Sequence, residues 1–116
     1  MKKMTVRVES FDAGLDRFKR AFESAEYQGE FVTFESMRDM MSALTSSRWE
    51  LIRALQAEGP MSLRALARRL GRDVKNVHRD VAALKDLGLI DDHRDGGIWV
   101  PYDEIAAELS LRRDAA

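Results

Sequence analysis

Helix-breaking residues divide the middle of the chain into three short helical segments. Gly59-Pro60, Gly71 and Gly88 each follow a run of residues whose apolar members recur at helical spacing. Glycine just past such a run, or proline beyond it, is the usual signal for the end of a helix. We therefore expect three helices, at about residues 47–57, 63–70 and 73–87.

Capping residues mark the starts of the first two segments. Ser47 and Glu50 have the spacing of a capping box, although Thr45 competes for the same role. Ser62 stands directly before the second segment, where its hydroxyl can accept a hydrogen bond from the first turn. These starts agree with the breaks in placing one short helix on each side of Gly59-Pro60.

A hairpin signal follows the third helical segment. Leu89-Ile90 and Ile98–Val100 are short apolar runs that we expect to form two strands, and Asp95-Gly96-Gly97 lies between them. An Asp-Gly pair between apolar runs favours a tight β-turn. Helix, helix, tight turn, longer helix and hairpin is the order of a winged helix-turn-helix. We expect that fold, of class α+β, over residues 44–105, with residues 106–116 as a C-terminal tail.

The first 43 residues predict a βαβα-like extension. Thr5–Glu9 alternates apolar and polar side chains, which indicates a strand with one face in water. A helix over about residues 11–27 follows, then a second strand at 31–34 and a short helix opened by Ser36. The apolar stripe of the first helix consists of Phe11, Leu15, Phe18 and Phe22.

This stripe predicts an association surface. Because the winged helix is already complete without it, the stripe is expected to bury against a dimer mate or a second protein. Four glutamates in the same half of the chain would suit a basic partner, and an ordinary solvated face is the alternative for them. They are Glu23, Glu26, Glu30 and Glu35.

The formal net charge of −1 hides a steep separation of charge along the C-terminal half. Between residues 62 and 79 there are six basic side chains and one acidic, whereas residues 80–108 hold eight acidic and two basic. A phosphate backbone responds to the local potential and not to the total charge. The net charge therefore does not exclude a nucleic-acid partner, because the basic stretch could bind its phosphates.

The third helical segment separates an apolar face from a face of hydrogen-bond donors. At about 100° per residue, Val77, Val81 and Leu84 gather on one side, and the donors of the first two turns gather on the other. Arginine can pair with guanine and asparagine with adenine, and the start of a recognition helix meets base edges. The expected base-reading residues are Arg72, Lys75, Asn76 and Arg79.

The preceding helix and the hairpin supply the other expected DNA contacts. The first helix of a helix-turn-helix crosses the DNA backbone, so Ser62, Arg64, Arg68 and Arg69 are expected at phosphates. Adjacent residues on a helix point about 100° apart, and we expect either Arg68 or Arg69 to miss the backbone. Arg94 at the hairpin tip is placed to reach the backbone or the minor groove. A solvated basic face is the alternative for the whole set.

The amino-acid sequence of this region resembles that of winged-helix transcriptional regulators of the MarR/ArsR type. The residues that carry the resemblance are LTSSRWELIRALQAEGPMSLRALARRLGRDVKNVHRDVAALKDLGLI and, from Ile98 onward, IWVPYDEI. Within that type it looks like TumA-like antitoxins of prokaryotic toxin-antitoxin pairs. The resemblance implies that the helix bearing Arg72, Lys75, Asn76 and Arg79 reads an operator, and that a dimer represses its own operon beside a toxin. The chain lacks the Cys/His pattern of metal-sensing ArsR relatives, so metal-responsive release is not expected.

Little in the sequence suggests catalysis or a bound metal. The chain has no cysteine and no phosphate-binding loop, catalytic elbow or zinc-protease motif. His78 and His93 with Asp91 and Asp92 could be drawn as a metal site, but the spacing is weak. Asp80 is better explained as an ion-pair partner of Arg48 or Arg53 than as a base. We expect that the protein is not an enzyme and that it binds no cofactor and no metal.

The composition and the first residues bear on location. With 45% hydrophobic and 34% charged residues, the chain is expected to be soluble, with no membrane partner. Met1-Lys2-Lys3 could open a signal peptide, but the polar and charged residues of Thr5–Glu9 occupy the place of its apolar region. We expect a cytoplasmic, nucleoid-associated homodimer on double-stranded DNA. The alternative is a winged-helix module that binds protein and not DNA.

Overall fold

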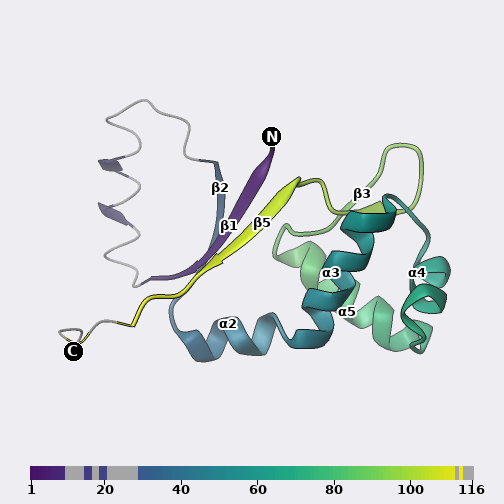
Figure 1. The fold of residues 1–116 in the computed structure, drawn as a ribbon, viewed down its shortest axis with the longest axis horizontal. Coiled ribbons are helices and arrows are strands. Elements are labelled where there is room, and N and C mark those ends of the chain that lie inside the picture. The colour runs from purple at the N-terminus through teal and green to yellow at the C-terminus, as the bar shows by residue number, and fades with distance from the viewer. Residues whose placement is uncertain (10–14, 17–18, 21–28, 112, 114–116) are drawn as a thin grey trace.

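The computed structural model is a mixed α+β structure, and it describes residues 1–9, 15–16, 19–20, 29–111 and 113 (Figure 1). The named elements are β1 (Lys3–Val8), β2 (Glu30–Phe34), α2 (Met37–Ala43), α3 (Ser46–Glu58), α4 (Leu63–Leu70), α5 (Val74–Asp86), β3 (Asp91–Asp92), β4 (Ile98–Trp99) and β5 (Glu104–Glu108). Of the apolar stripe expected in the N-terminal half, only Leu15 belongs to this part of the chain. Phe11, Phe18 and Phe22 lie outside the described residues.

One end of the molecule is a parallel sheet of three strands in the order β2-β1-β5. Thr5 of the central strand pairs with Phe31 of β2 on one side and Ala106 of β5 on the other. β5 thus brings the C-terminal part of the chain beside its start (Figure 1). The tail expected from residue 106 therefore begins inside a strand, and the boundary expected at residue 105 falls within β5.

The expectation of a water-facing side on β1 is wrong. Thr5 is 5% exposed and Arg7 is 8% exposed, so both are buried like Val6 between them. Arg7 forms an ion pair with Glu108 of β5 at 3.1 Å, and its guanidinium carbon lies 4.4 Å from the centre of the Phe31 ring. Alternation alone indicated a half-buried strand, but Phe31 of β2 and Glu108 of β5 contact Arg7 on this side. Its Nη2 atom is paired there, while Nε and Nη1 are buried without a hydrogen bond to any described residue.

The sheet and the helices share one hydrophobic core. Met4 and Val6 of β1 belong to the same buried cluster as Met40 of α2 and Leu51 of α3. Figure 1 shows α2 running from the sheet towards α3, so this short helix joins the two ends of the molecule. Residues 1–43 therefore contribute directly to the packing of the helices that follow.

The helix ends follow the local signals closely. Ser36, Ser62 and Asp73 cap α2, α4 and α5, each through a side-chain oxygen that accepts a backbone N–H bond from the first turn. At α3 the competition between Thr45 and Ser47 is decided for Thr45, which accepts from the Arg48 N–H. The chain turns from α4 into α5 at Gly71, in the left-handed conformation that glycine adopts without strain.

The hairpin is smaller than expected and has an additional backbone partner. β3 and β4 pair antiparallel, with Asp91 opposite Trp99, whereas Leu89-Ile90 is not a strand. The N–H groups of Leu89 and Ile90 bond instead to the carbonyl of Leu84 at the end of α5. Met61 exchanges two backbone hydrogen bonds with Ile98, at 2.8 and 3.0 Å, so the residue before the α4 cap holds the hairpin from the side.

This contact between Met61 and the hairpin predicts a large effect for Gly97→Ala. A Cβ atom at Gly97 would lie 2.7 Å from the Met61 carbonyl oxygen, and the backbone there has φ +81°. We expect the substitution to lower the free energy of unfolding by about 1–3 kcal/mol, as measured by urea denaturation. Gly96→Ala is the matched control, because Gly96 also has a positive φ but no atom within 4 Å of the new Cβ. Equal losses in the two variants would contradict a role for the Met61 contact.

Candidate nucleic-acid interface

The first two turns of α5 present a set of exposed polar side chains. Lys75, Asn76 and Arg79 are all exposed, and no ion pair is recorded for them among the described residues. The opposite face holds Val77 and Val81 in the core, as the helical periodicity predicts. Asp73 fixes the start of the helix by accepting a bond from the Lys75 N–H at 3.1 Å.

Arg72, expected with this set, is held elsewhere. Its Nη2 atom lies 2.6 Å from Oδ2 of Asp80, and its side chain is only 27% exposed. The guanidinium therefore belongs to an internal ion pair, and Arg72 leaves the group of free base-reading candidates. The helical wheel gives the direction of a side chain but not the partner that holds it, which is why sequence reasoning placed Arg72 with its neighbours.

Asp80 is a shared acceptor for two arginines. Arg48 of α3 donates from Nε to Oδ1 of Asp80 at 3.1 Å, and from Nη1 to the carbonyl of Ala43 at 2.7 Å. Arg48 was one of the two partners expected for Asp80, and Arg53 was the other. Burial alone would raise the pKa of Asp80, but the hydrogen bonds and charges of Arg72 and Arg48 outweigh it and hold the pKa below its ordinary value.

The basic residues of α4 fall into two kinds. Arg64 and Arg68 are exposed, and no ion pair is recorded for either within the described part of the chain. Arg69 is bound to Glu58 of α3, with Nε and Oε1 at 3.0 Å. The hydroxyl of Ser62 accepts from the Ala65 N–H at 3.1 Å, so its first role is to cap the helix. Of the adjacent pair, Arg68 is the better placed for a phosphate.

The hairpin carries one cation into solvent. The side chain of Arg94 is 90% exposed, between β3 and β4, and its nearest acidic neighbour is Asp95 at 3.9 Å.

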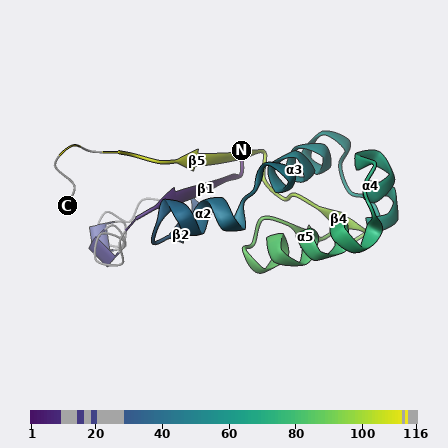
Figure 2. The ribbon, with the colours of Figure 1, turned by 90° about the horizontal axis from the view of Figure 1, so that it is seen from below.

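Figure 2 shows α4 at the end of the molecule away from β2, with the start of α5 beside it. The freely exposed donors of α4 and α5 thus belong to the end of the molecule opposite the parallel sheet.

Val74 is an exposed residue that sequence reasoning missed. As the first residue of α5 it lies next to the apolar stripe on the helical wheel, yet it is 41% exposed. The core ends one turn further along the helix, at Val77. The sequence does contain a signal for this exposure. Val74 directly follows the capping residue, and a side chain in the first turn projects past the body of the helix.

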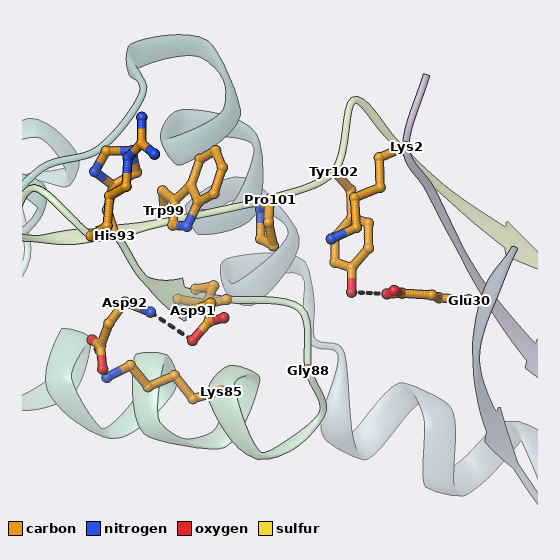
Figure 3. Close-up of a pocket in the computed structure, with 12 residues that line it drawn as sticks. Lys2, Glu30, Lys85, Gly88, Asp91, Asp92, His93, Trp99, Pro101 and Tyr102 are labelled. Atoms are coloured by element: carbon orange, nitrogen blue, oxygen red, sulfur yellow. Dashed lines mark hydrogen bonds and ion pairs between the residues drawn. The ribbon is translucent and has the colours of Figure 1, made fainter.

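A cavity of about 750 Å³ lies between the hairpin, the end of α5 and the sheet (Figure 3), and its lining mixes basic and acidic side chains. Its side chains are largely engaged with one another. Lys85 pairs with Asp92 at 2.7 Å, and the Tyr102 hydroxyl bonds to Glu30. Among the described residues, no group of three His, Cys, Asp or Glu side chains could hold a metal ion, and His78 and His93 do not form such a group.

Comparison with known proteins places the chain in a family. The family model HVO_A0114 matches residues 43–107, which is more than half of the chain. The chain belongs to the HVO_A0114 family. The match runs from the last residue of α2 into β5, so it includes the three helices and the hairpin. No curated protein and no solved structure matches the chain.

The HVO_A0114 region also contains the Asp80 ion pairs, which predict a pH-dependent stability. Asp80→Asn is expected to lower the free energy of unfolding by about 1–3 kcal/mol at pH 7, since two partly buried guanidinium groups lose their carboxylate. Because the pKa of Asp80 is lower in the folded chain than in the unfolded one, this contribution is complete well above the ordinary value of 3.8. It declines as the pH falls through the folded-state pKa.

Urea denaturation of both proteins between pH 7 and pH 3 measures this difference. Asp86→Asn is the matched control, because Asp86 is an exposed acid on the same helix and forms no ion pair with another described residue. A difference between wild type and Asp80→Asn that stays constant down to the lowest pH would show that the carboxylate charge is not what stabilises the fold.

Proposed function

We propose that this member of the HVO_A0114 family is a sequence-specific DNA-binding transcriptional regulator. Residues 44–105 would act as a winged helix-turn-helix, with α5 as the recognition helix and β3–β4 as the wing. The observation that carries the proposal is the state of the cations on α4 and α5. Arg69 of α4 and Arg72 of the turn before α5 are paired with Glu58 and Asp80, whereas four further donors form no ion pair with another described residue: Arg64, Arg68, Lys75 and Arg79.

The order of elements supports this reading. Two helices meet at a tight glycine turn, the second begins with exposed donors, and an antiparallel hairpin with an exposed arginine follows. This is the arrangement in which the start of a recognition helix contacts base edges while the preceding helix and the wing contact phosphates. A protein-binding module would more plausibly present apolar residues where Lys75, Asn76 and Arg79 stand.

The proposal includes a two-fold dimer that represses its own operon. One chain offers one recognition helix, and pairing two of them about 34 Å apart would match one turn of DNA. Residues 1–43 are proposed as the dimerisation or partner-binding part, and the exposed Leu15 is in keeping with that role. The resemblance to TumA-like antitoxins adds a toxin protein as a proposed partner of this part.

Base reading predicts a loss of discrimination in Asn76→Ala and Arg79→Ala. A duplex is first selected by the full chain from a pool of random sequence, and single base pairs are then changed. Each variant is expected to lose about 1–3 kcal/mol of preference for the selected duplex over its mismatched forms. Fluorescence anisotropy titrations at constant salt measure this. Equal weakening on every duplex would assign these side chains to phosphates.

Phosphate contact by α4 predicts a change in salt dependence. Replacing Arg64 or Arg68 by alanine should lower the slope of log affinity against log salt by about one unit while leaving the sequence preference intact. Arg69→Ala is the matched control, because Arg69 is already paired with Glu58. A slope that changes in Arg69→Ala but not in Arg68→Ala would reverse the assignment of these neighbours.

A further inference from the structure

The exposed Val74 differs from every other exposed side chain of α5. The remaining exposed positions on this helix are polar, charged or alanine, and the larger apolar residues Val77, Val81 and Leu84 are buried. A single exposed apolar residue is ordinary on a protein surface. What distinguishes Val74 is its place at the first position of the helix, directly before Lys75 and Asn76.

The local geometry gives Val74 a fixed direction. Cα–Cβ bonds in a helix tilt towards its N-terminus, so a side chain at the first position projects beyond the start of the helix. The Asp73 cap holds the backbone of this turn through the Lys75 N–H. Valine is branched at Cβ and has few side-chain conformations to choose from. Val74 therefore presents two methyl groups at the tip of α5 with little freedom to lose on binding.

The edges of the bases offer a specific complement to such a group. In the major groove the distinctive apolar feature is the 5-methyl group of thymine, and the other distinguishing groups are hydrogen-bond donors and acceptors. We propose that Val74 packs against the 5-methyl group of a thymine and makes the protein selective for thymine at that position of its site. This inference rests on the proposed DNA-binding function, because it assumes that the start of α5 enters the major groove.

Replacing thymine by deoxyuridine tests the contact directly. Deoxyuridine pairs with adenine as thymine does and lacks only the 5-methyl group. In the duplex selected by the full chain, each thymine is replaced in turn and binding is measured by fluorescence anisotropy. At one position at least, the wild-type chain should bind about fourfold more weakly, which is the effect of removing one buried methyl group.

The variant Val74→Ala should lose this discrimination and bind the thymine and deoxyuridine duplexes equally. Alanine favours the helix more than valine does, so α5 should remain intact, as circular dichroism can verify. Leu111→Ala is the control, because Leu111 is also an exposed apolar residue, at 84%, and lies in the C-terminal segment outside α5. It should keep the wild-type response to deoxyuridine.

The outcomes separate this inference from the function on which it rests. A chain that binds the selected duplex but responds to no deoxyuridine substitution overturns the thymine contact and leaves DNA binding intact. A Val74→Ala variant that still discriminates moves the contact to another side chain and overturns it equally. A chain that selects no sequence from the pool contradicts the proposed function, and the thymine contact with it.

Discussion

The helices of this protein are held in place by one carboxylate that serves two arginines. Asp80 on α5 accepts from Arg48 on α3 and from Arg72 in the turn between α4 and α5. Arg48 also donates to the carbonyl of Ala43, at the end of α2. A single acid thus connects four parts of the chain. The two arginines that it engages become structural, and Lys75 and Arg79 of α5 stay exposed.

This connection also gives the exposed donors a defined position. The apolar face of α5 fixes which side of the helix faces the core, but apolar packing is largely non-directional and tolerates rotation and sliding. Hydrogen bonds from two guanidinium groups are directional, and their geometry at Asp80 restricts both the rotation and the sliding of α5. Reading of DNA bases requires donors at fixed positions, so the ion pairs would support recognition without touching the ligand.

The parts of the fold that were predictable are those encoded by near neighbours. Ser62 and Gly71 lie within one turn of the helix ends that they define, and the core face of α5 repeats at helical spacing. Leu89-Ile90 was misread as a strand because a short apolar run has the same composition in a strand and in a buried helix end. The hydrogen bonds from these residues to Leu84 decide between the two.

Pairings between residues far apart in the sequence could not be predicted from local patterns. Nothing near Thr5 or Arg7 in the sequence indicates that β5 will lie beside them, so this strand was expected to have one face in water. The partner of Arg72 is eight residues away, across two turns of helix. The second partner of Asp80, Arg48, comes from α3, and the periodicity of α5 does not show where α3 will lie.

The parallel pairing of β1 with β5 has a consequence for synthesis of the protein. The backbone N–H of Lys2 bonds to the side chain of Asp103, 101 residues further along the chain. On the ribosome β1 emerges before the helices and its β5 neighbour after them, while the helices between them are made of local contacts that form quickly. The central strand of the sheet must therefore wait, with one edge unpaired, until the helices and the hairpin have been translated. During that interval the backbone of β1, Val6 included, has no strand partner on the β5 side, and an unpaired strand edge favours association with chaperones or with other unfinished chains.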